Sequence, residues 1–380
     1  MRQIGLASVV AIALLAPPSF AQQATSNGPY QVLKTSRVGG EGGFDYIYAD
    51  AAGGRLYIPR GGSRAVPATD STPAKAAVPG RITVWDLRSL APVGEIPNTG
   101  GQGVAVDPKS GHGFSSSRPV TMFDTKTLNL LKTIDVAPAA PDGILFDAYN
   151  ERVYIFSHPT RNATVIDARD GTVVGTVDLG GVPEEAVSDG RGTLYVVMQD
   201  AAGSVAVVDV NTMKTTAHYP FGDVGRCNGL ALDAEHHVLF AACASSGNPP
   251  AEPAQPMMVI MSSVDGKIIA KLPLPGASDG AVFNPATQEA FATLGNGLLA
   301  VVKENSPTSF EMEQTLPTML GARTITLDRG TNHILTMSFE RGPAPAAPPA
   351  GAQGGRGGRG YPPMGAPIPG SFTILVIGKP

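Results

Sequence analysis

The chain is poor in the features that mark several common protein classes. It has 2 cysteines and 1 tryptophan in 380 residues. It has no CxxC or CxxCH motif, which argues against a cysteine-ligated metal and a c-type haem. Acidic residues (32) outnumber Lys and Arg (28) and no basic patch is present, so no nucleic-acid partner is expected. Residues 22–380 show no sustained helical period and no run able to span a bilayer, which predicts an all-β fold.

The first residues have the pattern of a secretory signal peptide. Met1–Ala21 carries one basic residue, Arg2, then an apolar stretch from Ile4 to Leu15, and ends in PPSFA with small residues at the cleavage positions. We expect cleavage after Ala21 and a periplasmic or secreted protein. Residues 22–380 then form a single domain.

Seven short apolar strands end in an acidic or amide residue, and this ending repeats along the chain. The spacings between successive endings are 57, 40, 42, 44, 51 and 44 residues. The endings are Asp50, Asp107, Asp147, Asp189, Asp233, Asn284 and Asp328. A period of roughly 40–45 residues with about four strands per copy is typical of a β-propeller blade.

The end of the chain predicts how the ring closes. The seventh copy stops after its third strand, Phe372–Gly378, whereas Tyr30–Gly40 precedes the first copy and resembles a fourth strand. We therefore predict a seven-bladed β-propeller of four-stranded antiparallel blades, in which residues 30–40 form the outer strand of the last blade.

The position five residues before each repeated ending is polar in all seven copies. These residues, called the polar ring below, are Asp45, Gln102, Asp142, Glu184, Asn228, Asp279 and Arg323. First strands begin next to the central axis, so the seven side chains should line one mouth of the channel, together with His158. They either line a wet channel and cap backbone amides or bind a ligand there. An ion pair of Arg323 with its acidic neighbours and raised carboxyl pKa values are expected.

The two cysteines lie opposite one another in the fifth copy. Antiparallel pairing around the Asp233–His237 turn places Cys227 beside Cys243, about 4.5–5.5 Å apart between Cα atoms. Export to an oxidising compartment favours a disulfide; the alternative is two free thiols.

Three enlarged loops between second and third strands open on the mouth of the polar ring. They are Gly61–Gly80, Ala244–Pro256 and Glu340–Gly370. The third is a Pro/Gly/Ala low-complexity segment. It is either a tolerated insertion or a lid or arm that binds a partner.

The repeat units resemble a known family. NGLALDAEHHVLFAAC and ATVIDARDGTVVGTVDLGGVPE are similar to the YVTN-type repeats of YncE-like propeller proteins. This resemblance implies an exported seven-bladed protein with a binding or scaffolding role, and it transfers no catalytic residue.

A second resemblance implies an enzyme. Calcium-dependent lactonases of the gluconolactonase type carry NG and DG dipeptides at first-strand starts, similar to Asn228-Gly229 and Asp279-Gly280. It implies metal ligands at Asn228 and Asp279, with Glu184 or Asp45 as the remaining carboxylate and with Asp279 activating water. Those enzymes are usually six-bladed, which departs from the seven copies here.

The sequence therefore favours an exported, non-catalytic propeller that binds a small molecule, cation or protein partner at the channel mouth and needs no cofactor. The alternative is a metal-dependent lactonase-like hydrolase that uses a divalent cation such as Ca²⁺.

Overall fold

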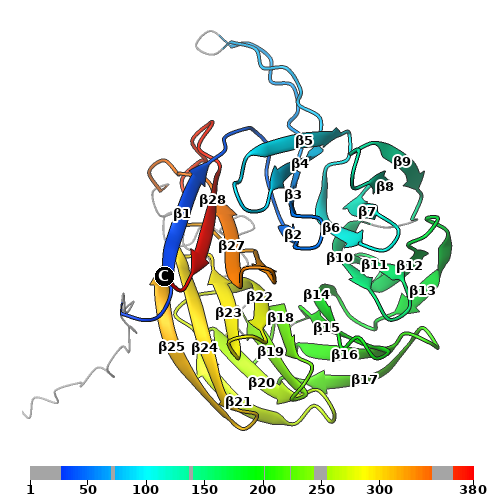
Figure 1. The fold of residues 1–380 in the computed structure, drawn as a ribbon, viewed down its shortest axis with the longest axis vertical. Coiled ribbons are helices and arrows are strands. Elements are labelled where there is room, and N and C mark those ends of the chain that lie inside the picture. The colour runs from blue at the N-terminus through cyan, green and yellow to red at the C-terminus, as the bar shows by residue number, and fades with distance from the viewer. Residues whose placement is uncertain are drawn as a thin grey trace, which may run out of the picture.

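The computed structural model describes residues 27–69, 73–136, 140–200, 202–222, 224–243, 255–344 and 363–380. In these ranges the chain forms 28 strands and no helix. The strands make seven four-stranded antiparallel sheets, which stand as blades around a central axis (Figure 1). The predicted seven-bladed β-propeller is confirmed.

The first three blades contain strands β2 to β13. Blade 1 is β2 (Tyr48–Asp50), β3 (Arg55–Arg60), β4 (Arg81–Asp86) and β5 (Pro92–Pro97); blade 2 is β6 (Gly101–Asp107), β7 (His112–Ser117), β8 (Val120–Asp124) and β9 (Leu130–Ile134); blade 3 is β10 (Pro141–Asp147), β11 (Arg152–Ser157), β12 (Asn162–Asp167) and β13 (Val173–Asp178). In each blade the first strand is innermost and the fourth is outermost.

The remaining blades follow the same order up to the last one. Blade 4 is β14 (Pro183–Ser188), β15 (Thr193–Met198), β16 (Ser204–Asp209) and β17 (Lys214–Pro220); blade 5 is β18 (Cys227–Asp233), β19 (Val238–Cys243), β20 (Met257–Ser262) and β21 (Ile268–Pro273); blade 6 is β22 (Ser278–Asn284), β23 (Glu289–Leu294), β24 (Leu298–Ser306) and β25 (Ser309–Pro317); blade 7 is β26 (Ile325–Asp328), β27 (His333–Ser338), β28 (Thr373–Gly378) and β1 (Gln31–Arg37).

The N-terminal strand closes the ring, as predicted. β1 pairs antiparallel with β28 from Gln31–Gly378 to Arg37–Thr373, so the first described strand completes the last blade (Figure 1). Just before β1, the backbone of Tyr30 exchanges two 2.9 Å hydrogen bonds with the side chain of Gln314 in blade 6. The closing strand therefore joins two blades and covers an edge that would otherwise be open.

Apolar side chains between neighbouring blades form the core. Second and third strands are buried along most of their length, whereas outer strands such as β17 alternate exposed and half-buried residues. Between blades 5 and 6, Phe240 of β19 stacks on Phe283 of β22 with ring centroids 5.4 Å apart. Each large apolar side chain buried in this way contributes roughly 1.5–3 kcal/mol.

The side chain of the repeated acidic ending stabilises the turn that follows the first strand. In the first copy, Asp50 Oδ1 accepts a 2.8 Å hydrogen bond from the Gly53 amide, and Asp233 Oδ1 accepts one of 3.0 Å from Glu235. Carboxylate or amide oxygens of the other five endings accept from the amide two residues on. This is the hydrogen bond of an Asx turn, which fixes the chain reversal between the first and second strands.

The disulfide prediction is confirmed. Cys227 at the start of β18 pairs in register with Cys243 at the end of β19, and the two form a disulfide with Cα atoms 3.7 Å apart. Both residues are fully buried. The disulfide is compatible with an oxidising compartment.

The three enlarged loops are described to different extents. Residues 61–69 and 73–80 form a narrow arm that projects from blade 1 (Figure 1), paired at Ser63–Val78 and Val66–Lys75. In the third loop, the Gly342 amide bonds to Ala366 O at 2.9 Å and the Ile368 amide to Glu340 O at 2.8 Å. Residues 244–254 and 345–362 lie outside the described ranges, as does the predicted signal peptide. No helix in the described ranges is long and apolar enough to cross a membrane.

Candidate functional site

The polar ring lies where the innermost strands begin, as the repeat predicts. Asp45, Asp142, Glu184, Asn228 and Asp279 are all buried. The Arg323 side chain is 29 % exposed. Gln102 is exposed, and its backbone carbonyl accepts a 2.9 Å hydrogen bond from the Tyr46 amide. The structure therefore gathers six of the seven predicted side chains and leaves Gln102 at the surface.

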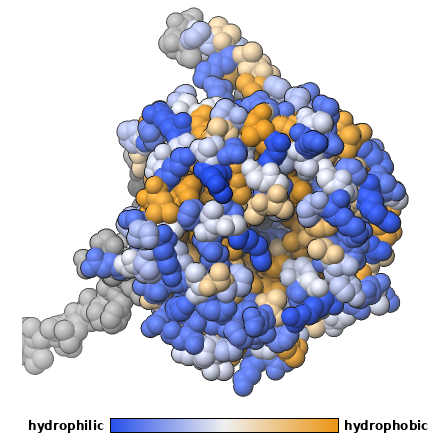
Figure 2. Space-filling model, viewed as in Figure 1, coloured by the Kyte–Doolittle hydropathy of each residue, from blue (hydrophilic) through white to orange (hydrophobic). Residues whose placement is uncertain are grey.

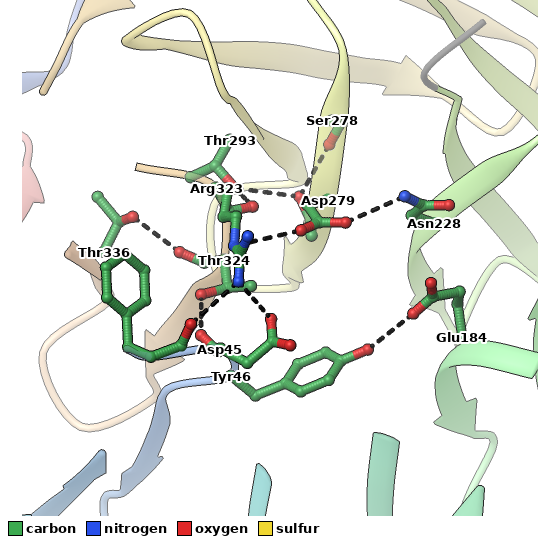
Figure 3. Close-up of polar contacts among 12 residues, drawn as sticks. Asp45, Tyr46, Glu184, Asn228, Ser278, Asp279, Thr293, Arg323, Thr324 and Thr336 are labelled. Carbon is green, nitrogen blue, oxygen red and sulfur yellow. Dashed lines mark hydrogen bonds and ion pairs between the residues drawn. The ribbon is translucent and has the colours of Figure 1, made fainter. Parts of the chain in front are cut away.

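Arg323 links three blades across one half of the polar ring (Figure 3). Its Nη2 lies 3.3 Å from Asp45 Oδ1 of blade 1, and its Nε lies 3.4 Å from Asp279 Oδ2 of blade 6. Asn228 of blade 5 donates a 3.0 Å hydrogen bond to Asp279 Oδ1. The guanidinium also sits 5.6 Å from the Phe44 ring centroid. The predicted ion pair of Arg323 with its acidic neighbours is confirmed.

His158 links the other half. It follows β11, and its Nε2 lies 2.8 Å from Asp142 Oδ2 and 3.6 Å from Glu184 Oε1. Tyr46 donates a 3.2 Å hydrogen bond to Glu184 Oε2 (Figure 3), and the Gln199 amide donates to Glu184 Oε1. The acids of this half are thus held by an imidazole, a phenol and an amide.

The crowded acids and their burial shift the pKa values of this half. Burial lowers the pKa of His158, but hydrogen bonds to Asp142 and Glu184 outweigh it and raise the pKa to about 10. His158 is therefore an imidazolium at neutral pH. Burial raises the pKa of Glu184, which agrees with the expectation of raised carboxyl pKa values.

The geometry groups the metal-ligating atoms differently from the set Glu184, Asn228 and Asp279. One donor atom each from Asp142, His158 and Glu184 lies within 4.8 Å of the others. Asn228 and Asp279 instead contact each other. A cation bound by these three residues would be held by two carboxylates and an imidazole.

A central cavity of about 580 Å³ runs along the axis behind the polar ring. Its walls come from the innermost strands and are largely apolar. The apolar lining includes Val104, Ile144, Leu145, Val187, Leu230, Ala281, Phe283 and Ile325. Tyr46 and Glu185 line it next to the polar ring, and Asp50 and Arg329 line the end at the first-strand turns. Figure 2 shows the molecule hollowed at the centre, with polar side chains beside the hollow.

Glu185 places a carboxyl group in this cavity next to the polar ring. It is half-buried and faces the cavity rather than the outside of the molecule. One oxygen, Oε2, accepts hydrogen bonds of 2.8 Å from the Leu230 amide and 3.0 Å from the Ala281 amide. Burial raises the pKa of Glu185 to about 8, and the charges of Asp279 and Glu184 add to the rise. At pH 7 the neutral acid is therefore the main form of this side chain.

Sequence reasoning missed Glu185 and Tyr46, although both adjoin polar-ring residues. In a regular strand, successive side chains point to opposite faces, so only one of Glu184 and Glu185 would face the channel region. The register of β14 shifts between Pro183 and Ala186, and this bulge lets both glutamate side chains lie near the central axis. The pair of adjacent glutamates was the available signal.

Comparisons with known proteins agree on the fold alone. No family model matches the chain, and no curated protein matches it in sequence. Among solved structures, the chain is similar to the WD40 repeats of RRP9, at 12 % identity and a TM-score of 0.64 over 93 % of this chain and 99 % of that one. It is similar to Kuenenia stuttgartiensis hydrazine synthase, at 14 % identity and a TM-score of 0.62 over 84 % and 96 %. It is also similar to U3-55K, at 12 % identity and a TM-score of 0.63 over 91 % and 98 %.

Fold and site together define a seven-bladed β-propeller with a largely apolar central cavity and, at one mouth, a group of paired polar side chains.

Proposed function

We propose that this protein is an exported, non-catalytic binding propeller whose central channel takes a small molecule with an apolar body and one basic group. One observation carries the proposal: a cavity of about 580 Å³ has largely apolar walls and the carboxyl group of Glu185 beside the polar ring, whereas Asp50 and Arg329 line its other end. Cavities of roughly 300–1,000 Å³ with few polar groups are typical of small-molecule sites.

The electrostatics of the channel favour a cation over an anion. Asp279 and Glu184 both raise the pKa of Glu185, so their negative potential reaches its carboxyl group. A protonated amine beside Glu185 would favour the carboxylate form and drive off its proton. The charge-assisted hydrogen bond formed then contributes about 1.5–3 kcal/mol. The apolar walls would cover the rest of the ligand.

Calorimetry with a matched panel tests this proposal. The mature chain is titrated with primary amines that carry alkyl or aryl groups, with the neutral alcohols of the same shape, and with the corresponding carboxylates. We expect binding of the amines only. Glu185→Gln keeps an oxygen for the Leu230 and Ala281 amides and should weaken amine binding about 10- to 100-fold.

The control is Glu311→Gln on the outer strand β25, where the glutamate is exposed. This variant should bind the amines as tightly as the wild type. Equal affinity for amines and alcohols, or an unchanged affinity in Glu185→Gln, would overturn the proposal.

A metal-dependent hydrolase is the second candidate, favoured by the three donor atoms of Asp142, His158 and Glu184 within 4.8 Å. A divalent cation there would act as a Lewis acid on a lactone carbonyl, with Asp279 as the base. In the described structure Asp279 is engaged by Arg323 and Asn228. Titration with Ca²⁺ and Zn²⁺, followed by a lactone and ester panel, tests this candidate. Turnover that is lost in His158→Gln would support it, and absence of turnover with either metal would reject it.

A protein partner would extend the binding role. We infer membership of the YncE-like group from the repeat pattern, and the arm 61–80 and the loop 340–370 are the segments available for capture. Deleting residues 345–362, between the paired bases of the third loop, should weaken partner capture and leave the unfolding temperature nearly unchanged. Undiminished capture would assign the partner to another surface.

A further inference from the structure

A second group of metal-ligating side chains lies at the opposite face, between blades 5 and 6. Asp233 ends β18, His236 lies in the turn that follows, and Glu304 belongs to β24 of the next blade. One donor atom from each lies within 4.8 Å of the other two. None of the three belongs to the polar ring or the channel lining.

Glu304 is a buried acid at a position that is uncharged in the five other blades that make the same backbone hydrogen bond. Its backbone amide bonds to the Gln288 carbonyl at 2.9 Å, after the end of the regular pairing of β23 and β24. The same bond defines the equivalent residues of five other blades: Leu87, Thr125, Ala168, Val210 and Ser263. None of these carries a charge. Burying a carboxylate costs several kcal/mol unless a partner compensates it.

Within the described residues, that compensation is incomplete. The Glu304 side chain is 1 % exposed, and its Oε2 has no hydrogen-bond partner there. Its one counter-charge is His236, whose Nδ1 lies 3.2 Å from Oε1. Two carboxylates that crowd one imidazole nitrogen are a better match for a divalent ion than for one proton.

The turn leaves a ligand atom on Asp233 available. Its Oδ1 accepts the turn hydrogen bond from the Glu235 amide, as in the other copies, while its Oδ2 lies 2.6 Å from His236 Nδ1. Histidine occurs three residues after the ending in this copy alone, whereas the other copies have Gly, Ser, Asn or Thr there. The imidazole and the buried acid therefore occur together at one blade junction of the seven.

We propose that Asp233 Oδ2, His236 Nδ1 and Glu304 form a binding site for a divalent transition-metal ion of the Zn²⁺ class. Two carboxylate oxygens and one imidazole nitrogen are ligands that suit Zn²⁺ at roughly 2.0–2.2 Å. The ion replaces the proton between Asp233 and His236, and a small turn of the imidazole opens the space. The His236 side chain is 35 % exposed, so water completes the coordination from the solvent side.

Metal titration of the mature chain tests the site. The protein is stripped with EDTA and titrated with Zn²⁺ by calorimetry and with Co²⁺ by visible absorption, which reports nitrogen and oxygen ligation. We expect one site per chain that persists in His158→Gln, because that variant alters only the polar ring. His236→Asn and Glu304→Gln should each weaken Zn²⁺ binding about 100-fold or more.

The neighbouring His237 supplies the matched control. It is exposed and has a positive φ of 60°, a conformation that asparagine tolerates, so His237→Asn should keep full affinity. His236→Asn changes a turn side chain and keeps the test decisive if Glu304→Gln does not fold. Absence of Zn²⁺ binding in the wild type, unchanged affinity in His236→Asn, or loss of the ion in His158→Gln would overturn the proposal. The last outcome would move the ion to the polar ring without touching the amine proposal for the channel.

Discussion

Replacing His158 with glutamine tests the charge that holds one half of the polar ring together. Glutamine can still donate a hydrogen bond toward Asp142 and Glu184, but it carries no positive charge. His158 Nε2 lies 2.8 Å from one carboxylate and 3.6 Å from the other. The variant therefore separates the effect of charge from the effect of hydrogen bonding.

The size and sign of the effect follow from the pKa of His158. A rise from 6.5 in the unfolded chain to about 10 in the folded protein corresponds to at most about 5 kcal/mol of stability. The side chain is 29 % exposed, so screening by water reduces this to about 2 kcal/mol. Because the folded pKa is the higher one, the contribution is fully present below pH 6.5 and is lost as the pH rises through about 10.

Urea unfolding of both proteins across this pH range is the assay. At pH 6.5 the wild type should be about 2 kcal/mol more stable than His158→Gln. The difference should shrink as the pH approaches 10, because the wild type then loses its imidazolium. A difference that stays constant between these pH values would refute an ionic role for His158. It would leave a hydrogen-bonding or packing role.

Three further predictions concern the fold. Replacing Cys227 and Cys243 with alanine opens a link of sequence separation 16 and should lower the unfolding free energy by about 3 kcal/mol; an unchanged urea midpoint would show that the disulfide adds no stability. A chain that starts at Gly39 lacks β1, so the edge of β28 is exposed and size-exclusion chromatography should show association, whereas a stable monomer would contradict the closure. Arg323→Met leaves Asp45 and Asp279 without their shared cation and should cost about 2–4 kcal/mol, and Arg323→Lys should recover part of it.

Most of the architecture was predictable from the sequence because each blade repeats the same local pattern of strands and turns. Asp233, for example, ends a strand and accepts the hydrogen bond of an Asx turn. The same residue therefore marks the blade in the sequence and forms the turn, which is why it recurs in each copy. The incomplete last copy required a strand from elsewhere, and Tyr30–Gly40 was the segment available. The pairing of Cys227 with Cys243 followed from strand register alone, because the turn of a β-hairpin fixes which residues of its two strands lie opposite each other.

The position of the site was predictable from the sequence, but the contacts among its side chains were not. The polar ring follows from the repeat, yet the contacts of Asp279 with both Arg323 and Asn228 depend on how neighbouring blades are placed, which no local pattern encodes. Glu185 reaches the channel because of a bulge in β14, and strand alternation predicts the opposite for one of two adjacent residues. Glu304 meets His236 across a blade junction, a contact between segments 68 residues apart in sequence.

Proton release on ligand binding is the most direct test of a basic ligand at Glu185. With a pKa of about 8, this group is roughly 90 % protonated at pH 7. Calorimetry of an amine in two buffers of different ionisation enthalpy should therefore give about 0.9 protons released per ligand at pH 7, falling toward zero above pH 9. Glu185→Gln should release none. Amine binding at pH 7 without proton release would contradict a role for Glu185 in recognition.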